Sequence, residues 1–231
     1  MLAVSENKSP VKDVQSKVPF SVVEAYKSIR VNLIHELAKS NAKVVLITSA
    51  NASEGKSTTA INTAITLSKM NKKVLLLDID VRRATVHKKL KLDNELGCIE
   101  LLAGDLNPQE VIKSYNPYLD VITSGGMANN VSELFASHEF DDLINTLKEE
   151  YDYIIIDSPP VNLVSDTLAV SQKCDGVVIV CYAGVTTTGN FRKAVSVFEN
   201  LNVKIIGVII NGVSSKSKKY YNKYGYNKYS Y

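Results

Sequence analysis

Cysteine is scarce in this sequence. The 231 residues include only three, Cys98, Cys174 and Cys181, and neither their odd number nor their spacing matches a common metal site. This excludes a small protein held together by disulfide bonds. Because Cys174 and Cys181 flank or lie within an apolar run, we expect buried, unreactive thiols. The low cysteine content is consistent with a reducing, cytosolic compartment.

Long hydrophobic runs are also missing. No segment approaches the roughly 18 consecutive apolar residues of a membrane-spanning helix. The first residues, MLAVSENKSPVKDV, lack the basic and then apolar pattern of a secretory signal. With 45% hydrophobic and 22% charged residues, the chain is not wholly disordered, and its length suits one domain of moderate size. If the protein works at a membrane, we expect another component to hold it there.

Acidic residues are absent from residues 214–231, which read SSKSKKYYNKYGYNKYSY and contain five lysines. The rest of the chain has 22 basic and 24 acidic residues, so a basic segment follows a slightly acidic body. Half of the twelve tyrosines lie in this segment: Tyr220, Tyr221, Tyr224, Tyr226, Tyr229 and Tyr231. Because so polar a segment cannot bury enough surface to fold alone, we expect a disordered tail at 214–231 and a mobile arm at 1–19.

Strand and helix signals alternate between the two ends. A helical stripe of apolar residues over 20–40 is followed by strands expected at 44–48, 73–80, 119–123, 152–157, 175–183 and 203–211. Helices are expected between them, at 57–70, 97–103, 108–114, 138–151, 164–173 and 187–201. Several strands are continuous runs of Val, Ile and Leu, which is typical of strands covered on both faces. The pattern predicts a three-layer α/β domain over 20–213 with a mainly parallel sheet.

A phosphate-binding loop is expected at Ala50–Ser57, ANASEGKS, between the first strand and its helix. In such a loop backbone N–H groups surround the β-phosphate, Lys56 bridges the β- and γ-phosphates, and the Ser57 hydroxyl binds Mg²⁺. Ala50 replaces the first glycine of the common pattern, so an ordinary strand-to-helix turn is the alternative. The residues expected to bind nucleotide are Ala52, Ser53, Glu54, Gly55, Lys56, Ser57 and Thr58.

Three carboxylates end two predicted strands. Asp78 and Asp80 lie two residues apart at the end of strand 73–80, and alternation along an extended strand puts both on one side. Asp157 ends strand 152–157. Ligands of open α/β sheets bind outside the carboxyl ends of strands, so we expect these acids to converge with the loop and hold Mg²⁺. The alternative for each is a turn or helix-cap residue.

The loop, LLLDIDVRR at 75–83, IIIDSPP at 154–160 and the terminal tyrosines together resemble the bacterial tyrosine kinases. The resemblance is to the stand-alone cytoplasmic kinases of Gram-positive capsule and exopolysaccharide operons. It implies a P-loop NTPase fold related to the septum-positioning and partition ATPases. It also implies Walker A, A′ and B motifs at Ala50–Ser57, Leu75–Asp80 and Ile154–Asp157. ATP and Mg²⁺ would be the cofactors, and the six tail tyrosines the autophosphorylation sites.

The resemblance also suggests site residues. It implies catalytic roles for Lys56, Asp78 and Asp80, and either aspartate could activate the tyrosine hydroxyl. Mg²⁺ would be organised by Ser57, Asp78, Asp80 and Asp157. Asn211 ends the last strand, where related folds place an adenine contact, and a strand-end turn is the alternative. Arg82 and Arg83 match the basic pair of the family and either steer an anionic group or form a solvated loop.

The predicted first helix carries Glu24, Lys27 and Arg30 in a pattern that the family uses for ring-like self-association. Lys27 replaces an arginine and loses its forked hydrogen bonding. The alternative is a solvated face with Glu24–Lys27 pairing. The resemblance further implies a homo-oligomer and a transmembrane adaptor of the polysaccharide co-polymerase type. The protein would lie at the inner face of the plasma membrane, with other protein substrates possible and no nucleic acid.

Two other functions are consistent with parts of the sequence. An ATP-driven dimer switch of the septum-positioning or partition type places a lysine second in the loop, where this chain has Asn51. A Lys/Tyr-rich tail that grips nucleic acid or anionic lipid is the other alternative. The preferred hypothesis is a protein-tyrosine kinase that phosphorylates its own tail in trans and regulates polysaccharide synthesis and export.

Overall fold

The computed structural model describes residues 19–104 and 106–213. The predicted arm, apart from Pro19, and the predicted tail with its six tyrosines lie outside the described residues. The helices of the described part are α1 Phe20–Ala38, α2 Lys56–Ser68, α3 Val86–Leu90, α4 Cys98–Ala103, α5 Pro108–Val111, α6 Val131–Ala136, α7 His138–Glu150, α8 Asp166–Ser171 and α9 Thr188–Asn200. The strands are β1 Val44–Ser49, β2 Val74–Asp78, β3 Ile112–Asn116, β4 Leu119–Ile122, β5 Tyr153–Asp157, β6 Gly176–Tyr182 and β7 Ile205–Asn211.

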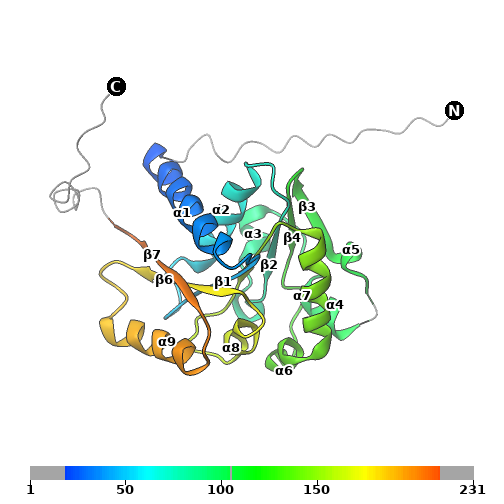
Figure 1. The fold of residues 1–231 in the computed structure, drawn as a ribbon. Helices are drawn as coiled ribbons and strands as arrows, with labels where there is room; N and C mark the ends of the chain where they lie inside the picture. The colour runs from blue at the N-terminus through cyan, green and yellow to red at the C-terminus, as the bar shows by residue number, and fades with distance from the viewer. Residues whose placement is uncertain (1–18, 105, 214–231) are drawn as a thin grey trace.

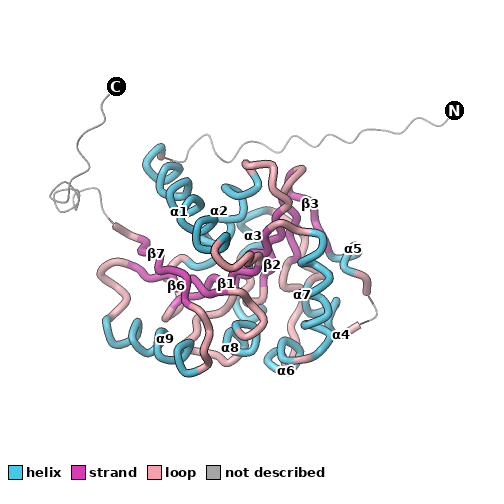
Figure 2. The backbone as a smooth tube through the Cα atoms, viewed as in Figure 1, coloured by secondary structure: helices cyan, strands magenta, loops and turns pink. Residues whose placement is uncertain are grey.

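The strands form one seven-stranded sheet with the order β3-β4-β2-β5-β1-β6-β7. Every pair is parallel except β3 and β4, which are antiparallel. Strands β1 and β2 at the centre are buried along their whole length, as expected for apolar runs covered on both faces. The predicted mainly parallel α/β fold is confirmed (Figures 1 and 2).

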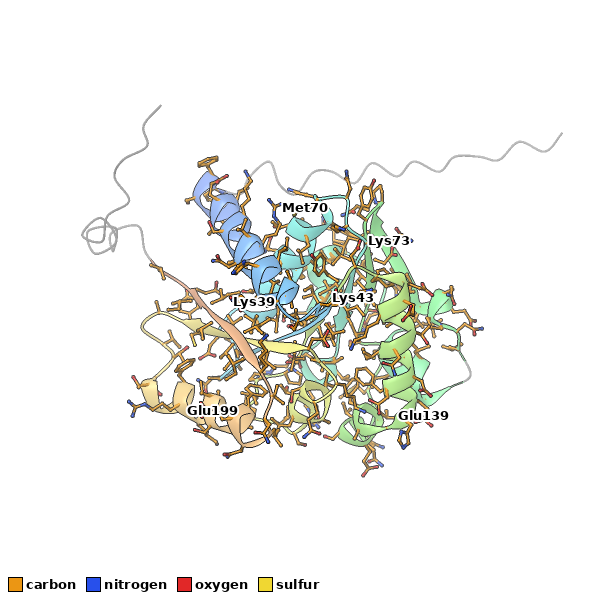
Figure 3. All side chains as sticks on the ribbon, viewed as in Figure 1. Lys39, Lys43, Met70, Lys73, Glu139 and Glu199 are labelled. Atoms are coloured by element: carbon orange, nitrogen blue, oxygen red, sulfur yellow. The ribbon has the colours of Figure 1, made fainter. Side chains whose placement is uncertain are left out.

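Helices cover both faces of this sheet and make two cores. On β1, Val45 and Ile47 face one core, which includes residues of α1, α2 and α3. Val44 and Leu46 face the other core, which includes residues of α4 and α6–α9. Figure 1 shows α1 and α2 on one side of the sheet and α8 and α9 on the other. Charged residues such as Glu139 on α7 and Glu199 on α9 lie on the outer surface (Figure 3).

The prediction of a helix over 108–114 was wrong in its second half. Helix α5 begins at Pro108 with a capping box between Asn107 and Glu110, but it ends at Val111. Residues Ile112–Asn116 form β3, an edge strand that pairs with β4. Antiparallel pairing with β4, which begins three residues after β3 ends, decided the structure of this segment and not its own helical pattern. Helices α3 and α6 were not predicted either.

None of the helices within the described ranges combines the length and apolar character needed to cross a membrane. Cys98 and Cys181 are buried and Cys174 is half-buried, and all three are free thiols. Burial raises the pKa of each of them, most strongly for Cys98 and Cys174. These thiols are therefore protonated near neutral pH, in agreement with the prediction of unreactive cysteines.

Candidate functional site

The loop predicted to bind phosphate connects β1 to α2. Gly55 immediately precedes α2 with φ +91°, a left-handed conformation that favours glycine. A Cβ atom at this position would also come within 2.6 Å of the Asn211 side-chain nitrogen. The glycine is therefore required both by the turn and by the close approach of β7. The loop leaves its backbone N–H groups at the N-terminus of a 13-residue helix, where an anion is stabilised.

Glu54 supports the loop from inside the protein. Its side chain is fully buried, and its carboxylate accepts hydrogen bonds from the backbone N–H of Asn51 (2.9 Å), the Asn51 side chain (3.0 Å) and the Thr186 hydroxyl (2.6 Å). Asn211 donates to the Glu54 carbonyl at 3.0 Å and to the Thr59 hydroxyl at 3.2 Å. Glu54 and Asn211 thus contribute to the loop's shape. Nothing in the sequence pattern singled out Thr186, because it lies 132 positions from Glu54.

A cavity of about 330 Å³ opens beside the loop. One side is the loop and the start of α2, and the other is formed by residues that follow β2. Of the predicted nucleotide-binding residues, all except Glu54 and Asn211 line the cavity. The lining residues are Ala52, Ser53, Gly55, Lys56, Ser57, Thr58, Asp80, Arg83, Thr85, Lys89 and Pro160.

The three predicted carboxylates converge beside Lys56. Strands β2 and β5 are neighbours, with Asp78 directly opposite Asp157 in the register. The Lys56 ammonium donates to the Asp80 carboxylate at 2.5 Å and lies 3.9 Å from Asp157. The expectation that Asp78 and Asp80 share one strand was wrong, because β2 ends at Asp78. Asp80 instead caps a 3-10 turn at 81–83, and its backbone N–H donates to the Asp78 carboxylate at 3.0 Å.

Burial determines the electrostatics of these acids. It is the largest influence on Asp157 and raises the pKa of that carboxyl to about 6, although the Lys56 ammonium and Ser57 hydroxyl lower it. Burial, followed by the charge of Asp157, also raises the pKa of Asp78 well above its usual range. Burial disfavours the Lys56 ammonium, but Asp157 and Asp80 outweigh that effect and raise the pKa of Lys56. Lys56 therefore remains the cation of an otherwise acidic centre.

The donors present fit a partly hydrated Mg²⁺ ion. Both side-chain oxygens of Asp157 and one of Asp78 are buried without a hydrogen-bond partner, and Ser57 supplies a hydroxyl nearby. In the described part of the chain, no group of three or more His, Cys, Asp and Glu side chains could hold a metal alone. Mg²⁺ is commonly bound by one or two carboxylates together with waters and substrate phosphates, and this arrangement matches that mode.

The basic pair after Asp80 is divided between two environments. The Arg82 guanidinium is paired with the buried Asp166 carboxylate at 3.1 Å. Arg83, the next residue, lines the cavity. The two arginines therefore differ in role. Arg82 links the 3-10 turn to α8, whereas Arg83 faces the site and is placed to contact an anionic group.

The residues predicted for self-association lie on α1, away from the cavity. Glu24 and Lys27 form an exposed ion pair at 2.7 Å. The Arg30 guanidinium donates to the Thr66 carbonyl of α2 at 3.0 Å, which anchors the first helix to the second. Leu33 and Leu37 of the predicted stripe are buried, whereas Val22 is exposed.

We expect Asp157→Asn to stabilise the metal-free and nucleotide-free protein. The folded state holds a proton on Asp157 more tightly than the unfolded state, so this carboxylate lowers stability by its full amount above about pH 6, and the loss shrinks as the pH falls from 6 toward the unfolded pKa of about 3.9. The amide should add about 1–3 kcal/mol at pH 7.5 and about half as much at pH 5. Urea unfolding in EDTA at both pH values measures the difference. A variant that is equally destabilised at both pH values would contradict the prediction.

Comparison with known proteins gives consistent matches. The sequence model of the ParA family, described as NUBPL iron-transfer P-loop NTPase, matches residues 40–226. Tyrosine-protein kinase YwqD of Bacillus subtilis (strain 168) is 35% identical over 203 residues, which cover 87% of this chain and 86% of that protein. The similarity thus spans the cavity and both of its walls.

Solved structures agree with the sequence matches. The crystal structure of the chimerical protein CapA2B2 is similar with a TM-score of 0.81 and 34% identity, over 87% of this chain and 88% of that one. The kinase domain of the Escherichia coli tyrosine kinase ETK is similar with a TM-score of 0.82 and 30% identity, over 91% and 80%.

Proposed function

This chain belongs to the ParA-type P-loop NTPases and, among them, to the bacterial tyrosine kinases, and we propose that it transfers the γ-phosphoryl group of ATP to tyrosines of its own C-terminal tail. The observation that carries the proposal is the meeting of Lys56, Asp78, Asp80 and Asp157 beside a phosphate-binding loop. Phosphoryl transfer depends on positioning and charge neutralisation more than on covalent chemistry by the protein. A buried lysine, three carboxylates and a loop of N–H groups supply both.

In the proposed reaction the tyrosine oxygen forms a bond to the γ-phosphorus as the bond from that phosphorus to the bridging oxygen of ADP breaks. The hydroxyl proton passes to a carboxylate. We assign that role to Asp80, because it lines the cavity and neither Asp78 nor Asp157 does. Ser57, Asp78 and Asp157 would hold Mg²⁺, which would neutralise phosphate charge. Lys56 would contact the β- and γ-phosphates as a point charge.

The proposal includes self-association through α1. An exposed ion pair such as Glu24–Lys27 contributes little to the stability of a single chain, so both groups are available to a neighbouring copy. Arg30 holds α1 on α2 at Thr66, near the end of α2 that is distant from the phosphate loop, and we propose that a copy associated through α1 reaches the site with its tail. As in the family it resembles, we propose a membrane adaptor as activator, a position at the inner face of the plasma membrane, and a role in capsule or exopolysaccharide synthesis.

The proposal is tested by mixing two chains, neither of which can phosphorylate its own tail. Full-length Lys56→Met protein supplies an intact tail, and an otherwise wild-type protein that ends at residue 213 supplies the active site. We expect the Lys56→Met tail to become phosphorylated only in the mixture with ATP and Mg²⁺. Mass spectrometry of the tail tyrosines is the measurement.

Two controls separate the possible failures. Wild-type protein alone must gain phosphotyrosine, and a wild-type sample without it would refute the kinase function itself. Wild-type activity together with an unmodified tail in the mixture would refute transfer between chains. A Glu24→Ala/Arg30→Ala variant should show slower transfer and a smaller mass by light scattering, and no change in either would refute the role of α1.

The alternative function, an ATP-driven dimer switch, requires a lysine at the second position of the phosphate loop, and this chain does not have one. Asn51 occupies the place of the signature lysine, and its side chain is directed to the buried Glu54 carboxylate. An uncharged side chain held in this way cannot act as the cation that such a switch extends across its dimer.

A further inference from the structure

The wall of the cavity opposite the phosphate loop carries three hydrogen-bond donors. They are Arg83 at the end of the 3-10 turn, Thr85 immediately before α3, and Lys89 within α3. Thr85 and Lys89 are four residues apart, and the Lys89 N–H donates to the Thr85 carbonyl at 3.0 Å, so both lie on one face. The wall thus places an arginine, a threonine and a lysine beside the same space as Lys56.

None of these donors is used by the rest of the described protein. The Thr85 hydroxyl oxygen is buried and makes no hydrogen bond within the described ranges. Among the ion pairs of residues 19–104 and 106–213, none involves Arg83 or Lys89. A buried polar group without a partner is costly, and an anionic ligand in the cavity would satisfy it.

The neighbouring Arg82 makes the contrast clear. Its guanidinium is paired with Asp166, a buried carboxylate that also accepts a hydrogen bond from Ser132 of α6. Arg82 therefore serves the contact between the turn and α8. Arg83 lacks such a partner and lines the cavity instead.

The position of this wall is tied to the acid proposed to receive the tyrosine proton. The backbone N–H of Arg83 donates to the Asp80 carboxylate at 3.1 Å. The other oxygen of that carboxylate accepts from Lys56 at 2.5 Å. One carboxylate therefore links the two sides of the cavity, and a group that reacts beside Asp80 lies between Lys56 and the opposite wall.

We propose that Arg83, Thr85 and Lys89 bind the γ-phosphoryl group during its transfer to tyrosine. This inference rests on the proposed function. If the loop's N–H groups hold the β-phosphate, as such loops do, the γ-phosphoryl group would lie on the side of the cavity formed by Arg83, Thr85 and Lys89. Charge is spread over its three equatorial oxygens in the transition state, and cations placed there accelerate phosphoryl transfer. Arg83 and Lys89 supply that charge from within the same chain.

The inference is tested with a transition-state mimic. Wild-type protein, Arg83→Ala, Thr85→Val and Lys89→Ala are titrated with a fluorescent N-methylanthraniloyl ADP and Mg²⁺, with and without aluminium fluoride. We expect ADP affinity within about threefold of wild type in every variant. With aluminium fluoride the Arg83→Ala and Lys89→Ala variants should bind at least 10-fold more weakly. Their kcat for autophosphorylation should fall on the order of 10²-fold, the size of loss that one preorganised contact gives.

Matched variants keep the test specific. Lys88→Ala removes an exposed charge next to Lys89 that does not line the cavity, and should leave both affinities and kcat unchanged. Arg83→Lys keeps the charge but loses the fork, and should recover part of the lost kcat. Circular dichroism and thermal unfolding identify any variant that fails to fold.

Three results would overturn the inference. The first is Arg83→Ala and Lys89→Ala proteins that phosphorylate at the wild-type rate. The second is an equal loss of affinity for ADP and for ADP with aluminium fluoride, which would indicate a general effect on the loop. The third is a Lys88→Ala variant as impaired as Lys89→Ala. Failure of the kinase proposal would give a different result. Wild-type protein would form no phosphotyrosine, yet the Arg83→Ala and Lys89→Ala variants would still bind ADP with aluminium fluoride more weakly than wild type does.

Discussion

We expect Lys56→Met to abolish autophosphorylation, with a loss of at least roughly 10²–10³-fold in rate. The Lys56 ammonium is the cation closest to Asp80 and also lies 3.9 Å from Asp157, at the centre of the buried carboxylates. Methionine keeps the length of the apolar stem and removes the charge that would meet the γ-phosphoryl group. A preorganised electrostatic contact of this kind is worth on the order of 10²–10³ in rate.

The variant should still fold, although it leaves buried carboxylates without their cation. We therefore expect a lower unfolding midpoint than wild type together with an unchanged far-ultraviolet circular dichroism spectrum. Lys72→Met is the matched control, because Lys72 forms only a surface ion pair with Asp152 at 3.4 Å. It should leave phosphorylation unchanged. Labelled ATP and anti-phosphotyrosine detection measure the rate, and full phosphorylation of purified Lys56→Met protein would falsify the site assignment.

Asp80→Asn should be nearly inactive for a different reason. Asparagine retains a side-chain oxygen that can accept the hydrogen bond from the Arg83 N–H. It cannot accept the tyrosine proton, and it no longer pairs with Lys56 as an anion. We expect kcat to fall on the order of 10²-fold or more even at saturating Mg²⁺, within the range of roughly 10²–10⁴ for loss of a catalytic acid or base.

Asp78→Asn and Asp157→Asn should instead alter the dependence on Mg²⁺. These carboxylates do not line the cavity and carry oxygens without hydrogen-bond partners, as expected for groups that organise an ion and its waters. Loss of such groups commonly weakens metal affinity 10–100-fold, so the Mg²⁺ concentration for half-maximal rate should rise by about that factor. Asp142→Asn on the exposed side of α7 is the control. Wild-type rates and Mg²⁺ dependence in all three site variants would refute the assignments.

Local patterns were sufficient for the central sheet and the phosphate loop. Strands β1, β2, β5, β6 and β7 were all expected from their apolar runs, since buried parallel strands need apolar residues on both faces. The loop was expected because ANASEGKS lies between a predicted strand and a predicted helix, which is the context that a phosphate-binding loop requires. Glycine is needed at position 55 for its left-handed φ, and that requirement is visible in the sequence.

The edge of the sheet was less predictable. Residues 112–116 carry no strong strand pattern of their own, and their conformation depends on hydrogen bonds to β4. The prediction that Asp78 and Asp80 lie on one strand was wrong for a similar reason. The spacing of two suggested one extended strand, but Asp80 leaves the strand to cap the turn at 81–83. Its approach to Lys56 comes from that turn and not from strand alternation.

The sequence by itself determined the fold class, the position of the phosphate loop and the identity of the acidic residues at the strand ends. Each of these follows from short-range rules of periodicity, turn geometry and charge. Only the tertiary structure decided what supports the loop and what faces it. Thr186 reaches Glu54 from the loop after β6 and Asn211 reaches it from the end of β7. Arg83 faces the cavity while Arg82 does not. The physical reason is that a side chain's partners depend on which segments the sheet brings together, and no local pattern specifies that arrangement.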